Sequence, residues 1–146
     1  MSKDKNEVNV LDELSKGCCM GMDAIYFIMD KVEDDSLKEE LTRQYSKYQK
    51  IHNGICKLYP EYSREDDPKE ISMMNKAMTW YGIEMKTMMD KTPSKIAELL
   101  LQGTNMGIIE GRKLLNHKDT NKEIESLIQE YVDMQEEAVE KLKTFL

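Results

Sequence analysis

Apolar residues recur every three or four positions along almost the whole chain, the spacing that gathers them on one face of an α-helix. The first such stretch carries Leu11, Cys18, Met22, Ile25 and Met29. No stretch alternates apolar and polar residues convincingly, as a half-buried strand does, so the sequence predicts an all-α protein. The pattern places five helices at about residues 7–32, 36–59, 68–90, 93–116 and 120–145.

Residues that commonly begin helices stand at the start of four of these segments. The stretches 36–39 and 120–123 each have Ser or Thr followed three residues later by Glu, which matches the capping box. Asp67 and Thr92 each precede a proline, as an N-cap residue does when proline takes the first helical position. These residues agree with the starts that the apolar spacing predicts.

The connections between the helices predict how they are arranged. The loops at 33–35 and 117–119 are short, so the first two helices and the last two should form antiparallel hairpins. A longer connection, which contains the third helix, joins the hairpins. Because 146 residues suit a single core, we expect one domain, residues 1–146, built as a helical bundle.

Glycines inside the predicted helices need an explanation, because each costs about 1 kcal/mol relative to alanine. They form two stripes with four-residue spacing, Gly17 and Gly21 in the first helix and Gly103, Gly107 and Gly111 in the fourth. Four-residue spacing puts them on one helix face. Either the two helices touch closely near Gly21 and Gly107, or large side chains such as Tyr45 or Tyr131 lie over the glycines.

Charge and composition narrow the possible partners. The chain has 21 Lys and Arg against 28 Asp and Glu, a net charge of −7, which argues against nucleic acids and anionic membrane surfaces. No apolar run is long enough to span a bilayer, and the opening MSKDKNEVN lacks the apolar region of a signal peptide. Three cysteines do not make a disulfide framework. We therefore expect a cytoplasmic protein.

Several longer segments resemble an uncharacterised bacterial ferritin-like family, a domain of unknown function. LDELSKGCCMGMDAI, VEDDSLKEEL and QYSKYQKI are similar to the first two helices of that family and the turn between them. MTWYGIEMKTMM looks like its crossover helix, and LLQGTNMGIIEGRKLL like the helix that follows. The resemblance implies a ferritin-like up-down bundle of four helices, with the additional helix in the crossover.

The ligands of a di-iron centre are missing from the matching positions. In ferritin-like di-iron proteins two helices each give a lone Glu and the other two each give a Glu-x-x-His pair. The resemblance places the two lone Glu positions at Met22 and Thr104, and no Glu-x-x-His pair occurs at His52 or His117. The fold is therefore expected without ferroxidase or oxygenase chemistry. We expect no cofactor and find no catalytic group of residues.

A modified metal site is an alternative to packing for the sulfur-rich stretch GCCMGMDAIYFIMD. Cys18 and Met22 lie four apart on the predicted core face, and thiolate and thioether ligands suit Cu(I). Folding the first hairpin about residues 33–34 puts Cys56 about two helical turns from Cys18, too far to share an ion or a disulfide. The residues of such a site would be Cys18, Met22, His52, Met106 and Glu110.

Packing and pairing explain the same residues more simply. Free Cys and Met commonly fill cores, so we expect Cys18 and Met22 to pack and to bind no metal. His52 should face Ser15 across the first hairpin as a hydrogen-bonded or exposed side chain. Glu110 should be exposed or pair with a nearby basic residue, for which the candidates are Arg43, Lys47 and Arg112.

The sequence thus favours a non-enzymatic ferritin-like bundle, a cytosolic interaction or stress-associated protein that self-associates. From Cys18 to Met29 only Asp23 is charged, so this helix should be covered on several sides, by the Met-rich third helix or by a second subunit. The latter would make a homodimer. The alternatives are a protein that handles iron or copper and a carrier of a small apolar ligand, since Met-lined bundle cores can hold hydrophobic guests.

Overall fold

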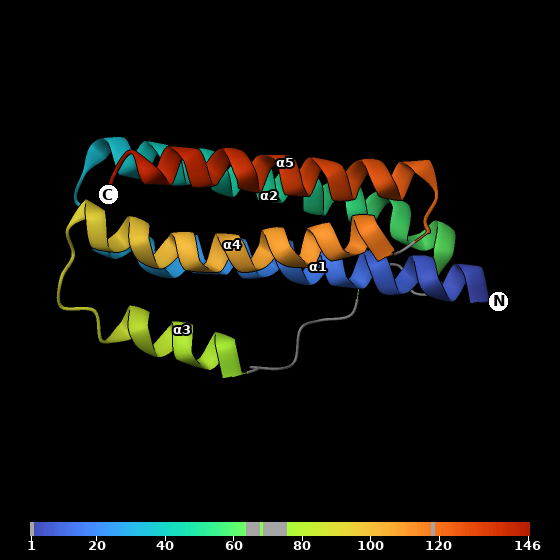
Figure 1. The fold of residues 1–146 in the computed structure, drawn as a ribbon, viewed down its shortest axis with the longest axis horizontal. Coiled ribbons are helices and arrows are strands. Elements are labelled where there is room, and N and C mark those ends of the chain that lie inside the picture. The colour runs from blue at the N-terminus through green and yellow to red at the C-terminus, as the bar shows by residue number, and fades with distance from the viewer. Residues whose placement is uncertain (1, 64–67, 69–75, 118) are drawn as a thin grey trace.

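The computed structural model describes residues 2–63, 68, 76–117 and 119–146, with side chains omitted for 2–4 and 76–80. This part of the chain is helical and contains no strand, which confirms the all-α prediction (Figure 1). Its elements are α1 (Ser2–Ile28), the 3-10 turn η1 (Met29–Lys31), α2 (Asp35–Tyr62), α3 (Lys76–Lys86), α4 (Pro93–His117) and α5 (Lys122–Lys143).

Four long helices lie side by side along the long axis of the molecule (Figure 1). α1 packs against α2 and α4, α5 packs against the same two helices, and α1 and α5 also meet across the core. α1 and α5 run in one direction, and α2 and α4 run in the other. The pairs α1–α2 and α4–α5 are therefore antiparallel hairpins, as their short loops predicted.

The short helix α3 lies outside the four long ones, beside α1 and α4 (Figure 1). The start of the helix predicted at 68–90, with its N-cap Asp67, lies outside the described residues, and Pro68 is not helical. At its other end the prediction was four residues too long, because α3 ends at Lys86. Asp90 instead accepts a hydrogen bond from the Thr92 backbone N–H at 3.0 Å, which prepares the start of α4.

Both predicted capping boxes are wrong. α2 begins one residue earlier than expected, because the Asp34 carboxylate accepts a hydrogen bond from the Leu37 backbone N–H at 2.8 Å. A charged acceptor makes a stronger hydrogen bond than a hydroxyl does. α5 begins after Asn121, so Thr120 is not its N-cap. The N-cap predicted at Thr92 is confirmed, because Thr92 Oγ1 accepts a hydrogen bond from the Lys95 backbone N–H at 3.2 Å.

Both helices of the first hairpin are longer than predicted. α1 begins at Ser2, five residues before the expected start, and its last expected turn is the 3-10 turn η1. α2 continues three residues beyond the expected end, through Pro60, to Tyr62. Proline lacks a backbone N–H and interrupts the hydrogen bonds of a helix. Pro60 lies in the last turn of α2, and the helix ends two residues later.

The core runs the length of the bundle between the four long helices. Its largest fully buried side chains are Leu11, Leu14, Ile28, Leu37, Leu41, Ile51, Ile55, Tyr59, Ile96, Ile124, Ile128 and Leu142. Within one chain, the other helices do not cover every side of the apolar stretch of α1. Tyr26 and Phe27 are 69% and 62% exposed, so the last turn of α1 presents two aromatic rings to solvent.

Candidate functional site

A groove with a cavity volume of about 860 Å³ runs between α1 and α4. Both glycine stripes line it, together with longer side chains of α1 and α4. Methionines stand at its rim, and tyrosines with one glutamine reach it from the other helices. Tyr48 of α2 and Tyr131 and Gln135 of α5 form its floor, and Tyr81 of α3 lies at one end.

The glycines of α1 make room for two tyrosine rings. A Cβ atom built on Gly17 would lie 2.2 Å from the Tyr131 hydroxyl oxygen, and one built on Gly21 would lie 2.4 Å from Cζ of Tyr48. Of the two explanations that the sequence left open, the large side chain is therefore correct. Tyr131 was one of the two rings considered, whereas Tyr48 takes the place expected for Tyr45. α1 and α4 are neighbours, but rings from other helices meet the glycines.

The glycines of α4 make room for side chains of α5. A Cβ on Gly107 would lie 2.0 Å from Nε2 of Gln135. A Cβ on Gly111 would lie 2.6 Å from Cγ2 of Val132. Contacts closer than 3 Å essentially never occur at a real Cβ, so these two α5 side chains occupy space that any larger residue would need.

Tyr81 closes one end of the groove from α3. Its ring lies over Gly103, where a Cβ would be 3.1 Å from the tyrosine oxygen. Its hydroxyl donates a 2.8 Å hydrogen bond to the Leu99 backbone carbonyl. This hydrogen bond joins α3 to α4 and so anchors α3 to the bundle.

The floor of the groove is polar but uncharged. Gln135, 2% exposed, donates from Nε2 to the Tyr48 hydroxyl at 3.2 Å. Its other amide atom, Oε1, is buried and has no hydrogen-bond partner in the described structure. Burial raises the pKa of Tyr48 to about 12 and raises the pKa of Tyr131 and Tyr81 as well. Phenols are already protonated at neutral pH, and burial extends this to a higher pH than usual.

Two of the five candidate metal ligands lie at the rim of this groove. Met106 is 43% exposed, and Glu110 is exposed one helical turn further along α4. The Glu110 carboxylate lies 3.7 Å from the Lys113 ammonium, a weak pair on its own helix. The expected partners were wrong, because Arg43, Lys47 and Arg112 pair with Glu40, Glu137 and Glu136.

The sulfur atoms of α1 belong to the core. Cys18 is fully buried, and burial raises the pKa of its thiol, with smaller contributions from Cys19 and Cys56. Met22 is half-buried and packs against the core cluster. At the matching level of α4, Thr104 is buried and donates to the Leu100 backbone carbonyl at 2.8 Å. The positions that the resemblance assigned to lone Glu ligands thus make packing and backbone contacts.

His52, the remaining candidate, is half-buried on α2. Its Nδ1 atom lies 3.8 Å from the Cys56 sulfur, one turn further along the same helix. The described residues contain no group of three or more His, Cys, Asp or Glu side chains placed to hold a metal ion. Cys18 and His52 are absent from the groove lining, so the structure does not bring the five candidates together.

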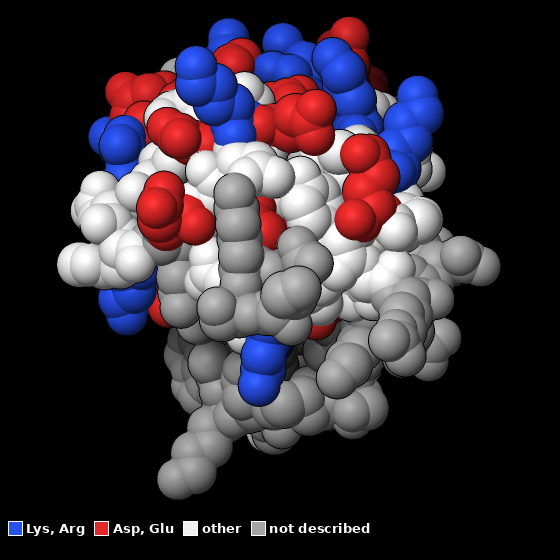
Figure 2. Space-filling model, turned by 90° about the vertical axis from the view of Figure 1, so that its right-hand side faces the viewer, with Lys and Arg blue, Asp and Glu red and all other residues white. Residues whose placement is uncertain are grey.

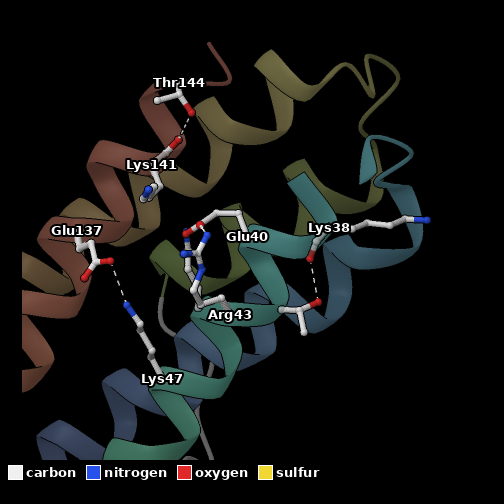
Figure 3. A network of polar contacts seen from close by, with 9 residues as sticks. Lys38, Glu40, Arg43, Lys47, Glu137, Lys141 and Thr144 are labelled. Atoms are coloured by element: carbon white, nitrogen blue, oxygen red, sulfur yellow. Dashed lines mark hydrogen bonds and ion pairs between the residues drawn. The ribbon is translucent and has the colours of Figure 1, made fainter. Parts of the chain in front are cut away.

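Polar contacts join α2 to α5 on another face of the bundle (Figure 3). Lys47 Nζ lies 3.1 Å from Glu137 Oε1 across the two helices. Glu40, only 6% exposed, accepts from Gln44 Nε2 at 2.8 Å and pairs with Arg43. A recess of about 570 Å³ opens beside this network. Because these side chains pair with one another, we assign the network a structural role.

A buried carboxylate that sequence reasoning missed lies at the beginning of α5. Glu7 is fully buried, and its Oε2 accepts from the Asn121 backbone N–H at 3.1 Å. A negative charge there is favoured by the unpaired N–H groups and the dipole of a helix N-terminus. Asn121 also donates from its side chain to the Tyr62 hydroxyl at 2.6 Å. Glu7 therefore ties α1 to the second hairpin.

The end of the molecule where α1 and α5 begin carries charges of both signs. Acidic and basic side chains are interspersed over the described part of this face (Figure 2). Among the helices described, none has a stretch long and apolar enough to cross a membrane. Comparison with protein-family models, with curated proteins and with solved structures finds no match to this chain.

Proposed function

We propose that this protein is a ferritin-like helical bundle without a di-iron centre, and that it binds a small, largely apolar molecule in the groove between α1 and α4. The observation that supports this function most directly is the groove itself. Its volume of about 860 Å³ falls within the roughly 300–1,000 Å³ common for small-molecule sites. Its lining combines glycine backbone, methionine and aromatic rings at the floor with charged side chains of both signs from α1 and α4.

The order of the helices supports the ferritin-like part of the proposal. Ferritin-like folds join two antiparallel hairpins by one long crossover, so that the second and third long helices run in the same direction. α2 and α4 do run in the same direction, and the connection between them passes through α3 (Figure 1). Tyr48 lies beside Gly21, Gln135 beside Gly107, and Tyr131 beside Gly17 and Gly111.

The chemistry of the core supports a non-enzymatic role. A catalytic thiol needs a lowered pKa and some exposure, whereas burial raises the pKa of Cys18. The phenols at the floor are uncharged at neutral pH, and burial raises their pKa further. These groups are suited to contact a bound molecule through rings and hydroxyls, and the proposal therefore assigns them to binding.

A blocking variant with a matched control tests ligand binding. Met106 and Ile109 are both exposed on α4, but only Met106 lines the groove. Met106→Trp should fill the rim and weaken binding of the neutral fluorescent probe N-phenyl-1-naphthylamine, while Ile109→Trp should leave it unchanged. Titration of each variant by fluorescence gives the comparison. The proposal fails if the wild-type protein does not bind the probe, or if both variants bind it as the wild type does.

We also propose, as a second function, that the protein self-associates through the end of α1. The observation that favours this is the pair Tyr26 and Phe27, which are largely exposed and contact each other edge to face with ring centroids 5.7 Å apart. Exposed aromatic clusters of this kind are common in protein interfaces. Sedimentation equilibrium should give a dimer that Tyr26→Lys weakens. A single mass near 17.1 kDa across micromolar concentrations would remove the idea.

A further inference from the structure

We infer that the molecule bound in this groove is uncharged and has one hydrogen-bond donor, a hydroxyl or N–H, that pairs with the side-chain carbonyl of Gln135. This inference rests on the proposed function, because it names the chemistry of a ligand for the same groove. It adds a specificity that an apolar groove alone would not have.

The unpaired acceptor on Gln135 is the first observation behind this inference. The residue is 2% exposed, and its Nε2 donates to the Tyr48 hydroxyl at 3.2 Å. Its Oε1 is buried without a partner among the described residues, yet Gln135 lines the groove. A buried carbonyl without a donor is unfavourable, so a ligand that supplies a donor should bind better than one of the same shape that does not.

The position of the amide limits where the ligand can lie. A Cβ on Gly107 would be 2.0 Å from Nε2, 2.9 Å from Cδ and 3.0 Å from Oε1 of Gln135. The Nε2 end of the amide thus lies closest to the α4 backbone, where any side chain at position 107 would displace it. Gly107 and Gln135 both line the groove, so this amide lies at the groove wall, with its carbonyl oxygen buried.

The charges around the groove favour an uncharged ligand. The phenols at the floor, Tyr48 and Tyr131, are neutral at neutral pH, as tyrosines ordinarily are, and burial raises their pKa further. The charged lining residues are of both signs, and Glu110 and Lys113 at the rim lie 3.7 Å from each other. A carboxylate at the floor would set a negative charge against the Gln135 carbonyl. An aromatic alcohol or amine, with an apolar body and a single donor, meets these conditions.

Two probes of similar shape test the inference. 2-Naphthol is neutral at neutral pH and has a hydroxyl donor, whereas 2-methoxynaphthalene has the same rings and no donor. The methoxy compound is the more apolar, so simple partition into an apolar groove predicts that it binds better. We expect the opposite order in the wild-type protein, with 2-naphthol bound about tenfold more tightly.

The variant Gln135→Met assigns the preference to the amide. Methionine has a similar length and adapts to irregular space, so the core should refold around it. Thermal unfolding checks that it does, and the wild-type comparison of the two probes does not depend on the variant. In Gln135→Met the two dissociation constants should agree within about twofold.

The outcomes separate the inference from the proposed function. Equal binding of both probes to the wild-type protein, or tighter binding of 2-methoxynaphthalene, would overturn the inference and leave the binding groove in place. A preference for 2-naphthol that persists in Gln135→Met would also overturn it, since the donor would then pair elsewhere. Failure of both probes to bind would overturn the groove together with the inference.

Discussion

Replacing Gly21 by alanine adds one methyl group where the structure has no space for it. The new Cβ would lie 2.4 Å from Cζ of Tyr48 and 2.7 Å from its Cε1 and Cε2. The ring cannot move aside easily, because Tyr48 is 3% exposed and its hydroxyl accepts a hydrogen bond from Gln135. Gly54 is a suitable comparison, since a Cβ there meets only Cδ2 of the half-buried Leu127, at 3.1 Å.

The two substitutions share one energy contribution and differ in another. Each alanine gains up to about 1 kcal/mol of helix propensity over glycine. Gly21→Ala also overpacks the core, which typically costs about 1–3 kcal/mol. Gly54→Ala needs only a small shift at the end of a flexible side chain. The free energy of unfolding of Gly21→Ala should therefore lie about 1–3 kcal/mol below that of Gly54→Ala.

Urea unfolding followed by circular dichroism measures this difference. At this chain length 1 kcal/mol corresponds to about 2–4 °C in Tm, so thermal unfolding gives an independent reading. The dependence on urea should stay the same in both variants, because neither changes the surface exposed on unfolding. Equal stability of the two variants would show that Tyr48 does not lie on Gly21, and it would refute this account of the glycines.

Three further predictions follow from the described contacts. Burial raises the pKa of Tyr48 from about 10 in the unfolded chain to about 12. The stabilisation of the folded state by protonated Tyr48 is therefore complete below pH 10. As the pH rises from 10 toward 12, the free energy of unfolding should fall by about 1.4 kcal/mol per pH unit. The proton uptake linked to folding at pH 11 should fall in Tyr48→Phe; an unchanged value would contradict this. Cys18 should react with iodoacetamide only when the protein unfolds, whereas native-state labelling at Cys18, mapped by mass spectrometry, would argue against its burial. Met22→Leu should cost under about 1.5 kcal/mol, and anaerobic titration with Cu(I) or Fe(II) should show no tight site that this variant or Cys18→Ala removes.

The sequence predicted reliably those parts of the structure that depend on residues close together in the chain. The three- and four-residue spacing predicted the helices of both hairpins, and the short loops predicted their antiparallel pairing. Thr92 was identified as an N-cap because its cap bond goes to Lys95, only three residues away. The choice between two possible N-cap residues was harder to predict. Asp34 and Ser36 both suit an N-cap, and only the folded backbone shows that Asp34 is used.

The groove and its chemistry depended on residues far apart in the sequence. The spacing of the glycines located a face with missing side chains on each helix, but it did not say what lies over them. Tyr48, Tyr131 and Gln135 reach those faces from other helices, and their places follow from the relative positions of the helices in the bundle. Glu7 meets Asn121 across 114 residues for the same reason. Periodicity specifies which side of a helix faces inward, whereas packing in three dimensions decides which partner each inward position meets.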